Sequence, residues 1–265
     1  MSTDLELPST RAAQTISQAT AVEQARAVAE VQSAVVVAQQ VPRDINRAVA
    51  EMRDSCGRKG LAERAFYTVP KRGNGPSVHL ARELARIWGN VQYGVHELRR
   101  DDASGVSEVQ AFAWDVQTNT RSTRTFIAPH ARMAGGRRQS LTDLGDIYLS
   151  NQNVGARAVR ECIFTILPAW FTEEAQDIAR ATVERGNGDD LGQRIAKAVA
   201  AFARIGVTVE QMETKVGRAR AQWDAHDLAD LQIAHTSITR DGLDKGEVFP
   251  PSPSTTTDDL LGGAA

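Results

Sequence analysis

Residues 91–128 constrain the fold more than any other part of the chain, because their apolar side chains recur at every second position. Successive side chains of a β-strand point to opposite faces of a sheet, so this period is typical of strands. The residues that separate the periodic stretches, 101–105 and 118–119, have the composition of tight turns. The stretches themselves are 91–98, 106–116 and 120–128. The sequence therefore predicts a three-stranded antiparallel meander.

The middle stretch of this meander has one aromatic face. Phe112, Trp114 and Val116 fall on one side of it, and the two alanines between them fall on the other. Large apolar side chains are buried more often than exposed. We therefore expect Phe112 and Trp114 to be core residues, together with Trp88 of the preceding segment.

Helical patterns surround the meander. Apolar residues at spacings of three and four predict five helices before residue 186, the fourth with a break near Ser150. These helices are 19–40, 42–55, 76–88, 142–167 and 172–185. The stretch 65–69 has the composition of a short strand, and residues 129–141 are predicted to form a Gly- and Arg-rich loop. The predicted fold class is α+β: a helix-dominated core around a three-stranded antiparallel meander, followed by a small helical module.

Composition divides the chain into four parts. Residues 1–18 are polar and are predicted to be disordered, and the core is predicted at 19–185. A hinge-like Gly-Asn-Gly-Asp sequence follows this core. Apolar residues at helical spacing then predict a three-helix, partner-binding module at 190–240. The Pro- and Ser-rich end, 246–265, is predicted to be a disordered tail because it has little apolar surface to bury.

The net charge of −2 hides an uneven distribution. Residues 41–170 carry a net charge of +6, whereas 1–40 carry −2 and 171–265 carry −6. A basic centre between acidic ends is a pattern expected of a protein that holds nucleic acid in its middle and makes other contacts at its periphery.

Arginine dominates the centre of the chain. Residues 121–160 contain seven arginines and no lysine, and only Asp143 and Asp146 oppose them. The planar guanidinium group donates two hydrogen bonds at once, which suits phosphate oxygens. Arg157 and Arg160 are three residues apart and so share one side of their helix. The pair 135–136 is Gly-Gly, a flexible sequence that can bring the following Arg-Arg-Gln close to a phosphodiester backbone.

Enzyme signatures are weak throughout. The Gly-Asn-Gly turn at 73–75 lacks the Gly-Lys-Ser/Thr ending of a phosphate-binding loop, and the five histidines show no metal-ligand spacing. Cys56, beside Arg58 and Lys59, could have a lowered thiol pKa, but no base is assigned to it, and an inert thiol is the favoured interpretation. We therefore expect no catalysis, no cofactor and no metal.

The chain lacks the features of secretion or membrane insertion. No apolar run approaches the roughly 20 residues that cross a bilayer, and the N-terminus has no signal-peptide pattern. The two cysteines lie far apart, which fits a reducing cytoplasm. We expect a cytoplasmic protein with no membrane contact.

Two runs of residues carry a family resemblance. The run 75–94, GPSVHLARELARIWGNVQYG, and the run 151–168, NQNVGARAVRECIFTILP, resemble phage proteins related to the RecT and lambda beta single-strand annealing proteins. The segments 206–218 and 223–231 resemble a small helical module that often follows such cores. The resemblance covers about residues 25–240.

The resemblance implies an ATP-independent recombinase that coats single-stranded DNA and anneals it to a complementary strand in phage homologous recombination. It also implies a homo-oligomer, either a ring or a helical filament, with DNA in a basic groove and an annealing duplex intermediate. A phage exonuclease and the host single-strand-binding protein would be its partners, in an infected or lysogenic bacterial cell. The family's basic hairpin and helix would correspond to Arg121, Arg124, Arg157 and Arg160. The loop contributors would be Lys71, Arg72, Arg137 and Arg138.

Charge, loop position and the resemblance together give a set of predicted DNA-binding residues, in which the tyrosine is a candidate for stacking on bases. The set is Lys71, Arg72, Tyr93, Arg121, Arg124, Arg137, Arg138, Gln139, Asn153, Arg157 and Arg160.

Three other interpretations remain open. One is a phage structural or assembly protein that uses its Arg-rich surface for protein contacts, and DNA binding would distinguish it from an annealing protein. Another is a duplex DNA-binding regulator, although no convincing helix–turn–helix spacing is present. The last is a nuclease, which a Mg²⁺-dependent digestion assay would reveal.

Overall fold

The computed structural model describes residues 17–134, 137–186 and 188–250 and divides the chain into two compact units, 1–42 and 43–265. The first unit contains helix α1 (Gln18–Gln40). Ser17 caps this helix, because its Oγ accepts a hydrogen bond from the backbone N–H of Thr20 at 3.2 Å. Residues 17 and 18, predicted to be disordered, are therefore the cap and the first residue of a helix.

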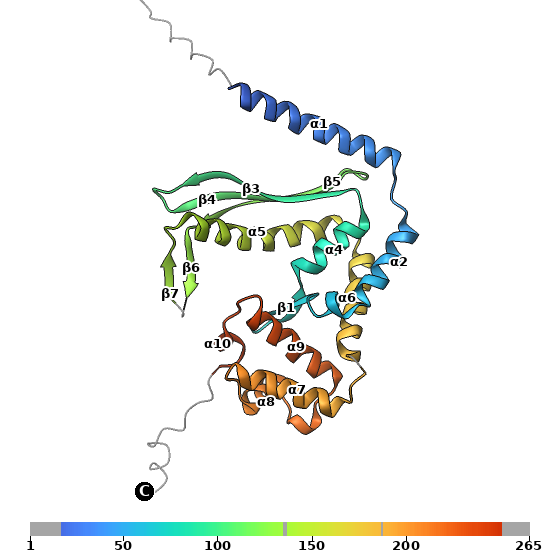
Figure 1. The fold of residues 1–265 in the computed structure, drawn as a ribbon, viewed down its shortest axis with the longest axis vertical. Coiled ribbons are helices and arrows are strands. Elements are labelled where there is room, and N and C mark those ends of the chain that lie inside the picture. Colours follow the sequence, from blue (N-terminus) through green and yellow to red (C-terminus); the bar gives the residue numbers. More distant parts are fainter. Residues whose placement is uncertain (1–16, 135–136, 187, 251–265) are drawn as a thin grey trace, which may run out of the picture. The chain divides into compact units, whose positions relative to one another are not determined.

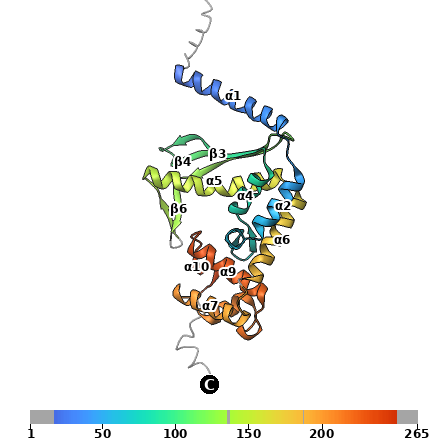
Figure 2. The same cartoon turned by 45° about the vertical axis from the view of Figure 1, so that its right-hand side comes forward.

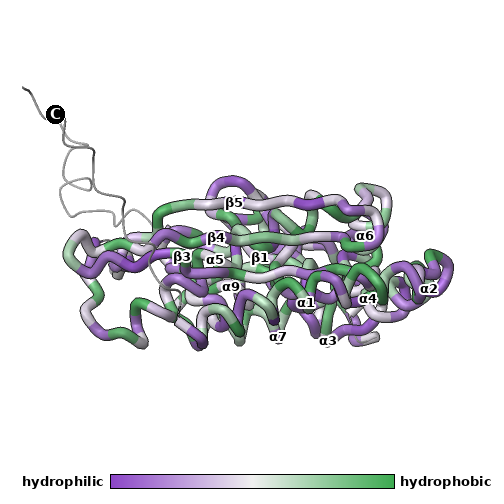
Figure 3. Tube along the Cα trace, turned by 90° about the horizontal axis from the view of Figure 1, so that it is seen from above, coloured by the Kyte–Doolittle hydropathy of each residue, from purple (hydrophilic) through white to green (hydrophobic). Residues whose placement is uncertain are grey.

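A three-stranded antiparallel sheet lies at the centre of the second unit and confirms the predicted meander. It consists of β3 (Val91–Asp101), β4 (Val106–Asp115) and β5 (Thr120–Pro129), with β4 in the middle (Figure 3). The register shifts between Glu97 and Arg99, which marks a β-bulge in β3. The fold class is α+β, as predicted.

Helix α5 (Leu144–Ile166) covers one face of this sheet, which we call the inner face (Figure 1). The inward residues along the middle of β4 are Val109, Ala111 and Ala113, and the two alanines are fully buried there. Gly155 of α5 lies against Val95 of β3, so closely that a Cβ atom on Gly155 would be 2.7 Å from Val95 Cγ1. Small residues on both sides thus let the helix approach the sheet.

The prediction that Phe112 and Trp114 belong to the core is wrong. Both side chains lie on the opposite, outer face of the sheet and are half-exposed, whereas Trp88 is buried as predicted. The physical reason is the close approach of α5 to the middle of the sheet, where Gly155 meets Val95 and the inward positions of β4 are Ala111 and Ala113 rather than aromatic residues.

Further helices and a short hairpin complete this core. They are α2 (Ile45–Cys56), α3 (Lys59–Ala62), α4 (Val78–Trp88), α6 (Ala169–Arg185), β1 (Phe66–Val69) and β2 (Gly73–Pro76). Asp44 and Ser77 cap α2 and α4 with their side chains, so the two helices begin later than the predicted starts at 42 and 76. Met52, Leu84 and Phe171 are among the side chains that fill the space between these elements.

Two local predictions differ from the structure. Residues 129–141, predicted as a loop, contain the antiparallel strands β6 (Ala131–Ala134) and β7 (Arg137–Ser140). Helix α5 is continuous through Ser150, where a break was expected. A Gly- and Arg-rich sequence has neither period two nor an apolar face, so the hairpin left no sign in the sequence.

The C-terminal helices form a second core. They are α7 (Leu191–Arg204), α8 (Val209–Val216), the 3-10 helix η1 (Arg220–Gln222), α9 (Ala225–Thr239) and α10 (Lys245–Val248). Helices α7, α8 and α9 are the three helices predicted within 190–240. Phe202, Met212 and Leu231 are central to this core.

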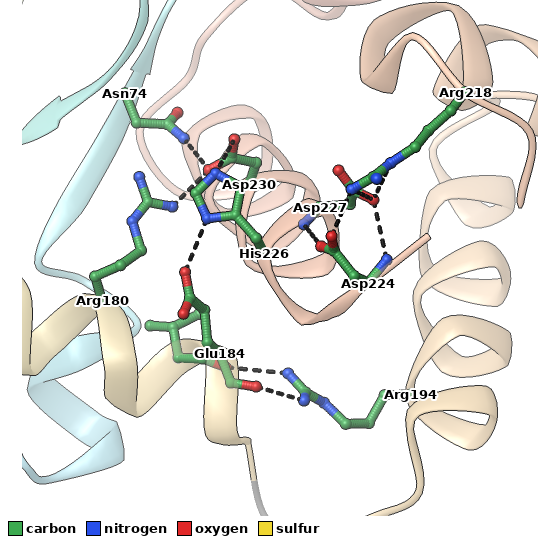
Figure 4. A network of polar contacts seen from close by, with 10 residues as sticks. Asn74, Arg180, Glu184, Arg194, Arg218, Asp224, His226, Asp227 and Asp230 are labelled. Atoms are coloured by element: carbon green, nitrogen blue, oxygen red, sulfur yellow. Dashed lines mark hydrogen bonds and ion pairs between the residues drawn. The ribbon is translucent and has the colours of Figure 1, made fainter. Parts of the chain in front are cut away.

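Helix α9 joins the two cores. Its Ala229 and Ile233 belong to the first core, whereas Leu228 and Leu231 belong to the second. Polar contacts add to this packing (Figure 4): Asp230 Oδ1 accepts hydrogen bonds from Asn74 Nδ2 at 2.8 Å and from Arg180 Nη1 at 2.5 Å. The predicted boundary at 186–190 therefore separates elements that pack together, whereas α1, which we assigned to the core, belongs to the other unit.

The predicted disordered tail begins too early. Val248 and Phe249 are buried, and the ring of Phe249 contacts that of Phe202 edge to face at a centroid distance of 5.2 Å. Val248 and Phe249 are thus part of the second core, and they supply apolar surface that the polar composition of the segment conceals. The rest of that prediction, 251–265, and most of the N-terminal one, 1–16, lie outside the described residues.

Candidate nucleic-acid interface

The side of α5 turned away from the sheet carries three of the predicted residues. Asn153, Arg157 and Arg160 follow one another at spacings of four and three, and we call them the basic stripe. Arg157 is exposed. Arg160 is half-buried: its guanidinium carbon lies 4.6 Å from the ring centroid of Tyr67, and its Nη2 lies 2.7 Å from Glu161 Oε1. The stripe therefore offers one free cation and one that is held in place.

The β1–β2 hairpin brings two more predicted residues to this side of α5. Tyr67, which contacts Arg160, belongs to β1 and pairs with Gly75 of β2. A Cβ atom on Gly75 would lie 3.2 Å from Tyr67 Cε1, so the ring lies across the glycine. Lys71 and Arg72 form the exposed turn between the two strands, with Lys71 in the left-handed region at φ 62°. The structure thus connects the basic stripe to a basic turn through Tyr67.

The β6–β7 hairpin carries Arg137, Arg138 and Gln139. It follows the sheet directly and projects past the N-terminal end of α5, on the side of α5 opposite the sheet (Figures 1 and 2). All three side chains are exposed, and Gln139 Oε1 accepts a hydrogen bond from Arg132 Nε at 3.4 Å. Hairpin and stripe therefore face the same side of α5.

The remaining predicted residues lie elsewhere on the sheet. Arg121 pairs with Trp114 and is on the outer face. Arg124 and Tyr93 pair with Ala111 and Ala113 and so are on the inner face, but on β5 and β3, the two edge strands. These three therefore lie apart from the predicted residues on the side of α5 opposite the sheet.

Free charge distinguishes the predicted basic residues. Of the eight, only Arg160 forms an ion pair with a carboxylate among the described residues. Arginines elsewhere are often neutralised: Arg53 pairs with Glu174 at 2.5 Å, and Arg86 pairs with Glu51 at 2.8 Å. Unpaired guanidinium and ammonium groups remain available for the phosphates of a ligand.

Sequence reasoning missed a basic cluster at the start of α4. Burial and the positive charge of Arg64, followed by those of Arg240 and Arg82, lower the pKa of His79, although Asp241 opposes them. These residues come from segments far apart in the sequence. No local pattern could have predicted their proximity.

It also missed the aromatic outer face of the sheet. The rings of His96 and Phe112 are stacked, with centroids 5.1 Å apart and planes 3° from parallel. The guanidinium carbon of Arg121 lies 5.8 Å from the centroid of Phe112. The alternation of side chains along β4 does indicate one aromatic face, but we expected that face to be the buried one.

Possible reactive groups are blocked by their surroundings. Burial, reinforced by the charge of Glu83, raises the pKa of the Cys56 thiol to about 12, so this thiol is not activated. Ser107 Oγ lies 2.8 Å from His130 Nε2, but the serine is fully buried and its hydroxyl donates to Glu97 Oε1 at 2.7 Å. Among the described residues, no group of three or more His, Cys, Asp or Glu side chains is placed to hold a metal ion.

A cavity of about 250 Å³ lies between α6, α7 and α9. Its cationic groups are engaged: Lys59 pairs with Glu63 at 3.4 Å, and Lys197 pairs with Asp189 at 2.6 Å. Arg194 donates to backbone carbonyls at the end of α6. Among the described residues, the lysine and arginine side chains that line the cavity are therefore already engaged.

Within the described part of the chain, no helix is both long enough and apolar enough to cross a membrane. Comparison of the chain with protein-family models, curated proteins and solved structures finds no match.

Proposed function

We propose that the protein binds single-stranded DNA and anneals complementary strands without nucleotide hydrolysis. The observation that carries the proposal is the group of free cations on one side of α5, formed by Arg157 with Lys71 and Arg72 and anchored by the stack of Arg160 on Tyr67. The β6–β7 hairpin adds Arg137 and Arg138 to the same side.

The chemistry of annealing matches such a surface. Two strands repel each other through their phosphates, and their base edges must stay free to pair. Contacts from arginine to phosphate neutralise the repulsion and leave the bases unread. Stacking on Tyr67 fixes the orientation of the Arg160 guanidinium group, and the Asn153 amide adds a neutral hydrogen-bonding group one turn before Arg157.

The resemblance extends this proposal to assembly. A homo-oligomer, ring or filament, would align many such surfaces and hold a strand extended, which lowers the entropic cost of finding the pairing register. A phage exonuclease, the host single-strand-binding protein and a cytoplasmic location in a bacterial cell belong to the same proposal.

The substitution Arg157→Ala tests the proposal. We expect weaker binding of a labelled single-stranded oligonucleotide, by about 1.5–3 kcal/mol for a lost charged hydrogen bond. The slope of log K against log salt should fall by about 0.7 for each lost phosphate contact. Fluorescence anisotropy across a salt series measures both quantities.

Arg58→Ala is the matched control, because Arg58 is an exposed arginine whose charge is already paired with Asp54. It should leave affinity and salt slope unchanged. Arg157→Lys should keep the slope while losing part of the affinity, since lysine retains the charge but not the planar fork. Binding by Arg157→Ala with the affinity and slope of the original protein would contradict the proposal.

A further inference from the structure

The outer face of the β3–β4–β5 sheet carries a group of aromatic and cationic side chains. We call His96, Phe112, Trp114 and Arg121 the stacking patch. His96 and Arg121 are exposed, and Phe112 and Trp114 are half-exposed. The register places Gly94 opposite Phe112 and Arg121 opposite Trp114, so the four side chains are neighbours on one face.

The rings of the patch are held in place before any ligand arrives. Phe112 lies across Gly94, where a Cβ atom would be 3.0 Å from its Cε1, and its ring is parallel to that of His96. Trp114 donates from Nε1 to Asn119 Oδ1 at 3.1 Å. Asn119 occupies the left-handed region at φ 55° in the β4–β5 turn. Fixed side chains lose little conformational entropy when they bind a ligand.

The charge of the patch suits an anionic ligand with flat, apolar parts. Arg121 has no carboxylate partner among the described residues, and none of the four patch residues is acidic. Gln110 and Thr125, further along the same face, hydrogen-bond each other at 3.3 Å and present polar atoms there. Unpaired nucleotides combine flat bases with phosphates, whereas the bases of a duplex are already stacked inside it.

We propose that the stacking patch binds the bases of unpaired nucleotides. This inference rests on the proposed function and deepens it. The sheet separates the patch from the basic stripe of α5, so the nucleotides on the patch are not those on Arg157. The patch holds a second stretch of single strand, which is the component that annealing requires beside the first.

The experiment compares two probes of equal length and charge: an oligo(dT) strand and the same backbone without bases. Stacking predicts that the full-length protein binds oligo(dT) more tightly than the abasic strand. The double substitution Phe112→Leu/Trp114→Leu keeps the face apolar but removes both rings. It should weaken oligo(dT) binding by about 5- to 150-fold for each ring lost from a stack, and leave abasic binding unchanged.

Matched variants separate stacking from other effects. Ile127→Ala removes an exposed apolar side chain from the same face and should change neither affinity. Trp114→Phe keeps a ring and should retain most of the preference for bases. Quenching of tryptophan fluorescence by oligo(dT) should be reduced in Trp114→Phe and retained in Trp170→Phe, since Trp170 is an exposed tryptophan on α6.

The outcomes distinguish the two proposals. If the original protein binds neither strand, the proposed function fails. If it binds both strands equally, or if the double leucine variant keeps the full preference for oligo(dT), the stacking patch is overturned while the phosphate-binding surface of α5 stands. A preference that disappears only in the patch variants supports the inference.

Discussion

At the scale of single residues, one buried ion pair secures the sheet to the helices. Arg43 Nη2 lies 2.9 Å from Asp115 Oδ2, and both side chains are almost completely buried. Arg43 Nε also donates to the backbone carbonyl of Trp88 at 2.7 Å. The other carboxylate oxygen, Asp115 Oδ1, accepts from the backbone N–H groups of Gln117 and Thr118, so the pair also holds the β4–β5 turn.

Breaking this pair should be costly. Asp115→Asn leaves the Arg43 charge buried without a counter-charge, and we expect a loss of about 3–5 kcal/mol in the free energy of unfolding. Chemical denaturation at pH 7 measures it. A loss comparable to that of an exposed pair, such as that broken by Asp54→Asn, would contradict the prediction.

The same pair predicts a pH dependence. Burial alone raises the pKa of Asp115. The hydrogen bond and charge of Arg43, together with hydrogen bonds from Thr118 and Trp88, outweigh burial, so the pKa in the folded protein lies below its ordinary value of about 3.9. The stabilisation by Asp115 is thus complete above that value and is lost as the pH falls through the lower folded pKa. The free energy of unfolding should therefore fall less steeply with decreasing pH in Asp115→Asn than in the original protein.

At the scale of elements, the packing of α5 on the sheet decides what each face can do. Gly155 and the β4 alanines bring the helix close, and Cys162 Sγ lies 3.7 Å from the carbonyl oxygen of Ala111. The aromatic residues of β4 are therefore directed to the outer face, and the arginines of α5 to the side opposite the sheet.

Gly155→Ala tests this packing, because the substitution should lower the free energy of unfolding here although alanine normally stabilises a helix relative to glycine. Alanine in a helix is favoured over glycine by about 0.8–1.0 kcal/mol. Here its Cβ would lie 2.7 and 2.9 Å from the two methyl groups of Val95, and overpacking costs about 1–3 kcal/mol. We expect a net loss of stability in the original background.

In a Val95→Ala background, where the methyl groups are gone, the same Gly155→Ala substitution should become stabilising. Chemical denaturation of the four proteins in this double-mutant cycle gives the coupling between the two positions. Stabilisation by Gly155→Ala alone would show that the contact between helix and sheet is looser than described.

Elements were predictable from the sequence where a local pattern exists. Period two and the turns at 101–105 and 118–119 predict the meander correctly. Periodicity shows which residues share a face, but not which face is buried, so Phe112 and Trp114 were assigned to the wrong side. The contact of Gly155 with Val95 determines which face is buried, and it joins residues 60 positions apart.

At the scale of the whole molecule, long-range packing determines where the arginines lie, whereas composition gives only their number. The excess of arginine indicated where free cations are found, and most of the predicted set lies on one side of α5. The stack of Arg160 on Tyr67 and the basic cluster around His79 depend on tertiary contacts. The sequence predicted a core and a C-terminal module. It did not predict that α9 contributes to both cores, because that sharing also depends on tertiary contacts.

The most direct test of the account is the rate at which two complementary fluorescent oligonucleotides anneal, measured without ATP over a series of salt concentrations. We expect the protein to accelerate annealing, the acceleration to fade as salt rises, and Arg157→Ala to reduce it. Absence of acceleration at low salt, with no binding of single strands, would contradict the account and favour a protein whose arginines make contacts with other proteins.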